Sequence, residues 1–379
     1  MKKIVALILT VTLACMMLTG CGTKNTTFQI ALITDKGNID DKSFNQGSWE
    51  GVVAFCKAND IKDYQYIKPE DASDAGYLAA IDNAVTAGAK VIVTPGFLFE
   101  VPVFEAQTKY PDVKFILLDG APHTADYKDN TMKANVASIM YAEEQSGYLA
   151  GYAAVKDGYT KLGFMGGMAV PAVVAFGYGY LQGIEAAAAE LGLADGAVSV
   201  TYHYTGDFAE TDTNKATAKT MYQEGTQVIF ACGGSVGKSV MSAATEANGK
   251  VIGVDVDQRY DSETVITSAE KGLGASVKTV LESIYKTNSW DTYAGKTTYF
   301  DASNAGVGLP TSIIGDEKGN AFDRFKTFDK TAYDAVYATL ANGSVKLLRT
   351  LTVADPNGIA TADELTAGLN LKKVAVTTR

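Results

Sequence analysis

Apolar and polar positions along the chain alternate in a way that predicts short strands and amphipathic helices. Apolar, β-branched runs predict strands over residues 28–35, 64–69, 90–96 and 114–120, and amphipathic segments predict helices near 46–58, 74–87 and 99–109. Strand and helix follow one another at the lengths expected for βαβ units. The first part of the chain therefore predicts an α/β lobe built on a doubly wound parallel sheet.

The same alternation restarts after a link at residues 132–138. It predicts helices near 140–156, 174–191, 212–224 and 236–247, and strands over 161–167, 198–206, 227–234 and 250–258. Two similar series of this kind predict two lobes. The expected fold class is α/β, with two doubly wound parallel sheets and a ligand cleft between them.

The expected lobe boundaries follow from the points where the alternation breaks. Residues 265–286 supply a strand and a helix that the first lobe can use, so the chain is expected to cross back after the second series. We expect lobe 1 to comprise 28–136 and 268–300, and lobe 2 to comprise 137–267 and 301–379. The tail predicts a helix near 328–342 and strands at 345–349 and 372–378, without indicating what they pack against.

The N-terminus has the order of features found in bacterial lipoprotein signals. Two lysines form a short basic start, an apolar run follows, and the motif LTGC closes it at Cys21. The run has the length of a signal-peptide core and is short for a membrane span. We expect residues 1–20 to be removed, Cys21 to carry a diacylglycerol thioether, and residues 21–27 to form a flexible tether. An ordinary secretory signal is the alternative.

Length and charge narrow the class of partner. Removing 20 of the 379 residues leaves 359, enough for two domains of ordinary size. The net charge of −10 becomes about −12 because Lys2 and Lys3 leave with the signal segment. Such a surface repels nucleic acid and anionic lipid. Nucleic acid is therefore not an expected partner, and the membrane is reached through the lipid anchor.

Few cysteines and histidines are available for a disulfide or a metal site. After Cys21 the sequence contains Cys56 and Cys232, both expected as small buried thiols rather than as a bridge. The two histidines, His123 and His203, are far apart in the sequence. We therefore expect no transition-metal site and no cofactor.

The segment CGGSVGKS, which begins at Cys232, resembles a phosphate-binding P-loop. That motif needs a glycine, four residues and then Gly-Lys-Ser/Thr, so that backbone N–H groups surround a phosphate. Counting back from Gly237, the first position falls on Cys232, so the spacing fails by one residue. We expect Lys238 and Ser239 to lie on the surface in the first turn of a helix, and no nucleotide triphosphate to bind.

Distinctive residues gather where the expected strands end. They are Asp35, Pro95-Gly96, Asp119, Gly166-Gly167, Gly233-Gly234 and Asp255. Parallel sheets bind ligands at the carboxyl ends of their strands, so two facing sheets would place these groups around one small molecule. A lone aspartate such as Asp35 or Asp119 can instead cap the helix that follows. Agreement among several strand ends favours a binding cleft.

Three motifs resemble one known family. TDKGNIDDKSFNQGSWEG at residues 34–51, GFMGGMAVPAVVAFGYGYLQG at 163–183 and VIGVDVDQ at 251–258 are similar to motifs of the BMP (basic membrane protein) substrate-binding lipoproteins, which include the purine nucleoside receptor A. The resemblance runs from about residue 28 to 310 and is most specific in the first motif. It implies a two-lobed type I periplasmic-binding fold that passes nucleosides to the permease of an ABC transporter.

For a purine base, aromatic faces and carboxylates are the expected partners. Phe44 lies beside Asn45 at the start of the first helix, where an aromatic face and polar groups converge. Phe176, in the second-lobe motif, is the candidate for the opposing face, and a role in the helix core is the alternative. Offset ring pairs contribute about 0.5–1.5 kcal/mol beyond area burial. Asp35 and Asp119 are expected to accept N–H groups of the purine edge.

For the ribose, a carboxylate and an ammonium are expected to hold the 2′ and 3′ oxygens. Asp255 directly ends a strand and is favoured over Asp257, and Lys278 is the candidate ammonium. The alternative for Lys278 is a solvated charge on a helix. Gly233 and Gly234 are expected to let backbone N–H groups approach the sugar or base closely.

Two other functions stay open on the sequence alone. A secreted nucleoside hydrolase would use aspartates as acid and base, but they are spread over two lobes without a nucleophile elbow or a metal-binding aspartate cluster. A sugar or signalling-molecule receptor would share the fold. The favoured expectation is a binding protein, not an enzyme, that captures guanosine, inosine or adenosine on the extracytoplasmic face of the cell membrane.

Overall fold

The computed structural model describes residues 28–316, 319–349 and 361–379. The expected signal segment, the tether and the lipid site at Cys21 lie outside the described residues. Within the described ranges, no helix combines the length and the apolar character that crossing a membrane requires.

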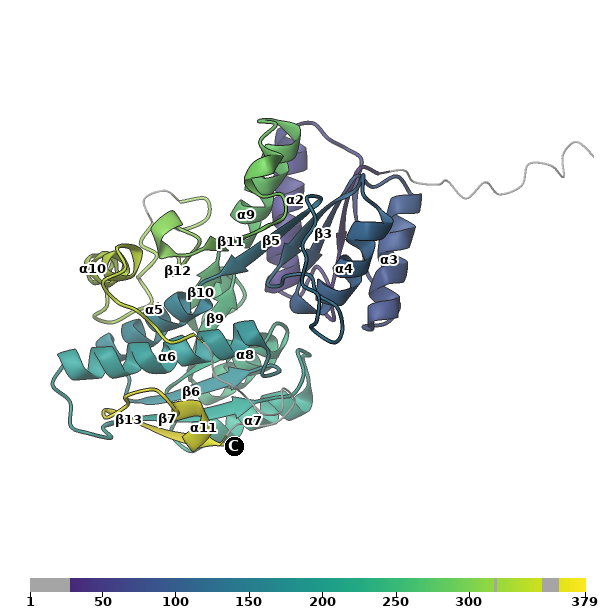
Figure 1. Cartoon of the computed structure of the whole chain (residues 1–379). Helices are drawn as coiled ribbons and strands as arrows, with labels where there is room; N and C mark the ends of the chain where they lie inside the picture. Colours follow the sequence, from purple (N-terminus) through teal and green to yellow (C-terminus); the bar gives the residue numbers. More distant parts are fainter. Residues whose placement is uncertain (1–27, 317–318, 350–360) are drawn as a thin grey trace, which may run out of the picture.

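The first lobe is built on a six-stranded parallel sheet with the order β11-β5-β4-β3-β1-β2. Its strands are β1 (Ile30–Ile33), β2 (Tyr64–Ile67), β3 (Val91–Pro95), β4 (Lys114–Leu118), β5 (Val136–Tyr141) and β11 (Lys296–Phe300), and its helices are α2 (Phe44–Ala58), α3 (Asp74–Thr86), α4 (Glu100–Lys109) and α9 (Leu273–Tyr285). Helices α2 and α9 cover one face and α3 and α4 cover the other (Figure 1). Ile30 and Leu32 pack in the core under α2, while Ala31 and Ile33 pack under α3, as strand alternation requires.

The second lobe contains a seven-stranded sheet with the order β12-β10-β9-β8-β6-β7-β13. Its strands are β6 (Lys161–Gly166), β7 (Val198–Tyr204), β8 (Val228–Cys232), β9 (Lys250–Asp255), β10 (Val265–Lys271), β12 (Val307–Gly308) and β13 (Val374–Thr378). Its helices are α5 (Glu143–Lys156), α6 (Pro171–Glu190), α7 (Asp212–Gln223), α8 (Val236–Ala247), α10 (Lys330–Ala341) and α11 (Ala362–Thr366). All neighbouring strands run parallel except β10 and β12. Single turns of 3₁₀ helix lie at η1 (Phe97–Phe99), η2 (Gln258–Tyr260), η3 (Trp290–Thr292) and η4 (Ala302–Asn304).

Helices α5 and α6 pack closely because glycines face the backbone of the partner helix. A Cβ at Gly147 would lie 2.1 Å from the carbonyl oxygen of Phe176, and a Cβ at Gly179 would lie 1.9 Å from that of Glu144. No side chain fits at such distances, so glycine is required at both positions. This packing fixes Phe176 and the start of α5 at the inner edge of the second lobe.

Among the described residues, three segments connect the lobes, and two of them lie later in the chain than expected. β5 pairs with β4 in the first sheet, and β10 pairs with β9 in the second. The first crossing therefore follows Tyr141 and the second follows Lys271, instead of lying at 136–137 and 267–268. β5 was not expected as a strand, since its residues were predicted as part of a link at 132–138 and of a helix near 140–156, and a short apolar run does not by itself distinguish strand from helix. Buried strands of parallel sheets are apolar throughout, so the pattern of β10 suited either sheet. The third crossing joins β11 to β12.

The C-terminal tail lies against the second lobe. Helix α10 packs against α5, and β13 pairs in parallel with β7 at the sheet edge. The expectation of a strand at 345–349 is wrong, because this segment is irregular. The Leu348 N–H and carbonyl bond the Gln182 side chain on α6 instead, at 2.9 and 2.8 Å. A side-chain amide thus satisfies backbone groups that have no neighbouring strand.

Candidate ligand site between the lobes

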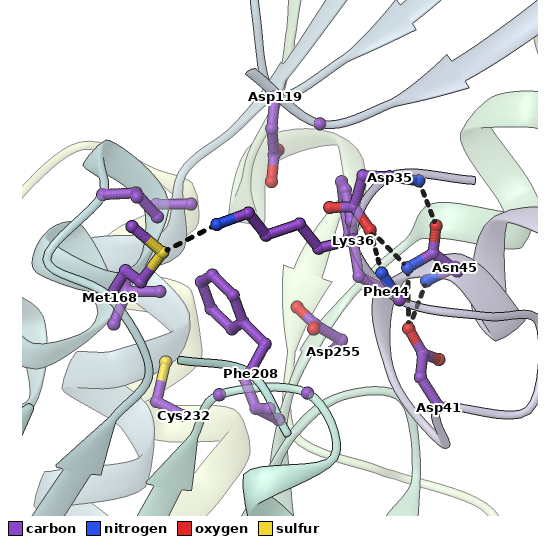
Figure 2. A pocket seen from close by; sticks show the side chains of 18 of the residues that line it. Asp35, Lys36, Asp41, Phe44, Asn45, Asp119, Met168, Phe208, Cys232 and Asp255 are labelled. Atoms are coloured by element: carbon purple, nitrogen blue, oxygen red, sulfur yellow. Dashed lines mark hydrogen bonds between the residues drawn. The ribbon is translucent and has the colours of Figure 1, made fainter. Parts of the chain in front are cut away.

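A cavity lies between the lobes, at the carboxyl ends of both sheets (Figure 2). It encloses about 940 Å³ of empty space, including its opening to solvent, which suits a small organic molecule. The residues that line it include several expected from the sequence, namely Asp35, Phe44, Asn45, Asp119, Phe176, Gly233, Gly234 and Asp255. The expected residue that it does not include is Lys278.

Asp41 holds the start of α2 and so positions the first part of the site. Its carboxylate accepts the backbone N–H groups of Ser43 at 2.9 Å, Asn45 at 3.0 Å and Gln46 at 3.1 Å. These amides belong to the helix N-terminus, where no intrahelical acceptor exists. Asp41 is therefore a helix cap, and it places Phe44 and Asn45 at the cavity.

Asn45 orients Asp35. Its Nδ2 donates to Asp35 Oδ1 at 2.8 Å and to Asp41 Oδ2 at 2.9 Å, and its Oδ1 accepts the Asp35 N–H at 3.2 Å. The Gly37 N–H adds a donor to Asp35 Oδ1 at 2.9 Å. Within the described part of the chain no group donates to Asp35 Oδ2, so this oxygen is able to accept from a ligand. Burial raises the pKa of Asp35 to about 6, although these hydrogen bonds oppose the shift.

Lys271, the last residue of β10, brings a buried positive charge to the cavity. Its ammonium pairs with Asp119 across the lobes, and lies 3.3 Å from Glu143 Oε1 and 3.8 Å from Asp255 Oδ1. The Lys271 side chain is only 2% exposed. Burial opposes the charged form, but the attraction of the three carboxylates outweighs it and raises the pKa of Lys271.

Asp119 and Asp255 end strands of different lobes and face the same cavity (Figure 2). Both adopt left-handed backbone, with φ of +55° and +68°, which aspartate tolerates better than most residues and which recurs at functional sites. Asp255 Oδ2 accepts the Ser43 hydroxyl at 2.5 Å. Asp119 Oδ2 pairs with Lys271, while its buried Oδ1 has no hydrogen-bond partner among the described residues. Burial raises the pKa of both carboxyl groups.

Lys278 does not reach the cavity, contrary to expectation. It lies on the outer side of α9 with its side chain 46% exposed, 3.8 Å from Glu282. The preceding Val277 is buried against the sheet, so the helix directs Lys278 to solvent. Two other lysines, Lys36 and Lys271, line the cavity, and the buried one is Lys271, which sequence reasoning missed. The same strand-end argument that selected Asp255 would have selected Lys271 too.

Asp257, the alternative to Asp255, has a structural partner. Its carboxylate accepts Arg259 Nε at 2.8 Å and Nη2 at 2.6 Å, a two-point pairing. Arg259 also donates to the carbonyls of Ser312 and Ala321. Asp257 therefore anchors the segment that follows β12, and the cavity lining contains Asp255 instead.

Four phenylalanines line the cavity, namely Phe44, Phe97, Phe176 and Phe208. The ring centroids of Phe44 and Phe176 lie 4.8 and 5.4 Å from the Lys271 ammonium. Phe176 also belongs to the core, where it packs edge-on against Phe230 at 5.9 Å. Phe208, in the loop after β7, was not expected, and its ring extends into the pocket (Figure 2). An aromatic residue just after a strand, in TGDFAE, is the sequence signal that would have marked it.

Glycines that follow β6 and β8 allow the loops after β6, β7 and β8 to pack closely against one another. A Cβ at Gly167 would lie 2.4 Å from the ring of Phe208, and a Cβ at Gly233 would lie 2.8 Å from the Gly167 nitrogen. Gly234 has a φ of +55°, a conformation that favours glycine. Gly233 and Gly234 line the cavity. Because they lack side chains, two loops of the protein come into close contact there.

The loop that resembles a P-loop uses its N–H groups internally. The N–H groups of residues 236–238 donate to the carbonyls of residues 233–235. Lys238 Nζ donates to the Asp40 carbonyl at 3.1 Å, across the lobes, and does not line the cavity. Ser239 is buried and its hydroxyl bonds the segment before α7, so the expectation that it lies on the surface is wrong. The loop therefore does not form a phosphate cradle.

Thiols and imidazoles do not gather at the site. Cys56 and Cys232 are free and buried, and Cys232 lines the cavity. His123 lies beside Glu100, with 3.1 Å between Nε2 and Oε2. Within the described ranges, no group of three or more His, Cys, Asp or Glu residues could hold a metal ion.

Comparison with known proteins identifies one matching family model and several relatives with similar sequences. The family model described as "ABC transporter substrate-binding protein PnrA-like" (Bmp) matches residues 28–337. The ABC transporter nucleoside-binding protein BmpA of Lactococcus lactis subsp. cremoris is 31% identical, over 86% of this chain and 97% of that protein. Basic membrane protein A of Borreliella burgdorferi is 28% identical, over 82% and 87%.

Solved structures show the same fold at lower identity. An ABC transporter solute-binding protein from Aeropyrum pernix K1 superposes with a TM-score of 0.73 at 22% identity, covering 90% of this chain and 98% of that chain. One from Conexibacter woesei gives a TM-score of 0.63 at 22% identity, covering 85% and 99%. The expected two-sheet fold of the periplasmic-binding type is confirmed.

Proposed function

The chain belongs to the PnrA-like family of ABC transporter substrate-binding proteins, and we propose that it captures purine nucleosides for uptake. Guanosine, inosine and adenosine are the proposed ligands, and the permease of an ABC transporter is the proposed recipient. The relative from Lactococcus lactis carries the name of a nucleoside-binding protein. The family consists of substrate-binding proteins, not enzymes, so the hydrolase alternative is set aside.

The observation that carries the proposal is Asp119 Oδ1, which has no hydrogen-bond partner among the residues that the structure describes and lies beside the buried Lys271 ammonium. A buried acceptor without a donor is unfavourable by about 1–3 kcal/mol. A ligand N–H or O–H group at this position would satisfy it. Nucleosides offer both kinds of donor, because the base carries N–H groups and the ribose carries hydroxyls.

The ribose is proposed to lie between Asp255 and Lys271. The 3.8 Å between Asp255 Oδ1 and the ammonium exceeds a hydrogen bond, so a hydroxyl can bridge the two groups. It would donate to the carboxylate and accept from the ammonium. Ser43 occupies Asp255 Oδ2, which leaves Oδ1 for the ligand.

The base is proposed to lie against aromatic rings near Asp35. Phe44 offers one stacking face from the first lobe, and Phe208 offers one from the second in addition to the expected Phe176. Asp35 Oδ2 is available for an N–H group of the purine edge, and Asn45 supports the interaction by holding Asp35 in place.

The membrane anchor is part of the proposal and rests on the sequence. The LTGC motif supports lipidation of Cys21, which would tether the protein beside its permease on the extracytoplasmic face. Cys21→Ser should move the protein from the membrane fraction to the soluble fraction without changing its affinity for ligand. Retention of the variant in the membrane fraction would contradict the anchor.

Equilibrium dialysis tests the ligand class. The purified chain without its signal segment is dialysed against guanosine, inosine, adenosine and the pyrimidine nucleoside uridine at equal concentration. Chromatography of the protein compartment should show excess intact purine nucleoside. Equal distribution of all four compounds would refute the proposal.

A further inference from the structure

One arginine of the C-terminal tail reaches the first crossing between the lobes. Arg349 follows α10 and lies beyond residues 28–337, which the family model matches. Its Nη1 donates to the Tyr141 carbonyl at 2.7 Å and to Glu144 Oε2 at 2.5 Å. Its Nη2 lies 2.6 Å from Glu143 Oε2. The guanidinium therefore holds the point where β5 leads into α5.

Glu143 connects this arginine to the ligand cavity. Its Oε2 faces Arg349, while its Oε1 lies 3.3 Å from the Lys271 ammonium. Lys271 in turn pairs with Asp119 and lies 3.8 Å from Asp255. A row of alternating charges thus runs from the tail to Asp119 and Asp255, which line the ligand cavity.

Arg349 changes the balance of charge around Lys271. Without the arginine, one ammonium would face three buried carboxylates. The Glu143 side chain is 1% exposed and that of Arg349 is 26% exposed, so the arginine brings the second positive charge in from the surface. A buried carboxylate that loses a partner is strongly unfavourable, and it would draw the remaining cation toward itself.

We propose that Arg349 is a positioning residue for nucleoside binding. By pairing with Glu143, it leaves the Lys271 ammonium directed at Asp119 and Asp255. The identity of the ligand in this inference rests on the proposed function, whereas the position of the ammonium does not. The tail outside the matched family region thereby contributes to the affinity of the site.

Other contacts hold the tail, so loss of the arginine charge need not detach it. The Gln182 side chain bonds both backbone groups of Leu348, the residue before Arg349. Farther along, Tyr178 donates to the Ala367 carbonyl and β13 pairs with β7. Reduced affinity in an Arg349 variant would therefore report the lost charge rather than a lost tail.

The test compares Arg349→Met and Arg349→Lys with a matched control. Arg379 lies in the same tail and pairs with Glu224 outside the cavity lining, so Arg379→Met removes a similar charge elsewhere. Calorimetric titration with guanosine should show about ten-fold weaker binding for Arg349→Met, as for other coupled charges. Arg349→Lys should bind within about three-fold of wild type. Arg379→Met should match wild type, and circular dichroism confirms that each variant is folded.

A second substitution that restores affinity distinguishes a positioning role of Arg349 from general support of the fold. Glu143→Gln in the Arg349→Met background removes the carboxylate that competes for the ammonium, and it should restore most of the lost affinity. Wild-type affinity in folded Arg349→Met would overturn the proposal. So would an undiminished loss in the double variant.

A measurement without ligand keeps this inference separate from the nucleoside assignment. In protein labelled with nitrogen-15 lysine, the Lys271 ammonium resonance is identified by its disappearance in Lys271→Gln. Arg349→Met should shift this resonance, the double variant should return it, and Arg379→Met should leave it in place. An unmoved resonance in Arg349→Met would refute the inference. Shifts as expected in a protein that binds no nucleoside would refute the proposed function alone.

Discussion

The Ser43 hydroxyl donates a 2.5 Å hydrogen bond to Asp255 Oδ2, and the two residues belong to different lobes. Ser43 immediately precedes α2 in the first lobe, and Asp255 ends β9 in the second. The bond joins the lobes beside the cavity and leaves Asp255 Oδ1 on the side of Lys271. Under the proposed function, contact between the lobes and recognition of ligand would depend on the same carboxylate.

Asp255→Ala should weaken purine nucleoside binding by roughly ten- to a hundred-fold. Hydrogen bonds to charged groups contribute about 1.5–3 kcal/mol net. Asp261→Ala is the matched control, because Asp261 pairs with Lys42 across the lobes at 3.3 Å on the surface. The control should change affinity less than about three-fold in calorimetry. Equal losses in both variants would mean that Asp255 acts only through contact between the lobes.

Lys271 and Lys278 lie on consecutive elements, but substituting them should have different effects on nucleoside affinity and on the thermal midpoint. Lys271→Met should reduce nucleoside affinity at least about ten-fold and lower the thermal midpoint, because it leaves buried carboxylates without their cation. Lys278→Met should change neither quantity measurably, because its side chain faces solvent. Calorimetry and thermal denaturation of the two variants provide the check. A larger loss of affinity in Lys278→Met would place the ligand on the outer side of α9.

Phe208→Ala should weaken binding of guanosine, inosine and adenosine by a similar factor, roughly three- to thirty-fold. Ring stacking and buried area are largely indifferent to the substituents that distinguish these bases. Tyr299→Ala serves as a control, since Tyr299 is exposed on β11 and lies outside the cavity lining. Loss of affinity for only one of the three nucleosides would exclude a stacking role for Phe208.

The stability of the ligand-free protein should carry a pH dependence from Asp35. Burial raises the pKa of Asp35 to about 6 in the folded state, so folding favours the neutral acid. Its contribution to the free energy of unfolding is therefore fully present below the ordinary aspartate pKa and is lost as pH rises through about 6.

Asp35→Asn mimics the neutral acid and isolates this effect. Urea denaturation at pH 4 and pH 7.5 should show that wild type loses about 1–3 kcal/mol of stability with rising pH relative to the variant. The comparison cancels the titration of other buried acids such as Glu100 and Glu270, which both proteins share. Parallel pH profiles would show that Asp35 titrates in the ordinary range.

Hydrophobic alternation predicted most of the order of strands and helices, because the periodicity of each depends on the local sequence. It predicted a link and the start of a helix where β5 lies, and it assigned most of β10 to the first lobe, since both outcomes depend on pairing with β4 and β9. The expected strand at 345–349 failed for a related reason. Its apolar residues suit a strand, but the neighbour of this segment is a helix.

The residues of the candidate site likewise include some that the local sequence predicts and others that depend on contacts between distant parts of the chain. Asp119 and Asp255 were found because a strand end positions a side chain from its local sequence alone. Lys278 was predicted, and Lys271 was not considered, because a helical lysine was not tested against the face that its helix buries. Arg349 had no signal at all, since its role depends on a tail that folds back to Glu143 from far along the chain.

The most direct test of nucleoside binding is calorimetric titration of the chain, without its signal segment, with guanosine, guanine and ribose. In the proposed function, aromatic faces hold the base and Asp255 and Lys271 hold the sugar, so tight binding would need base and sugar on one molecule. We expect saturable one-to-one binding of guanosine, and binding of free guanine and free ribose that is weaker by at least about a hundred-fold. Tight binding of ribose or another monosaccharide, with no heat from guanosine, inosine or adenosine, would contradict the proposed function.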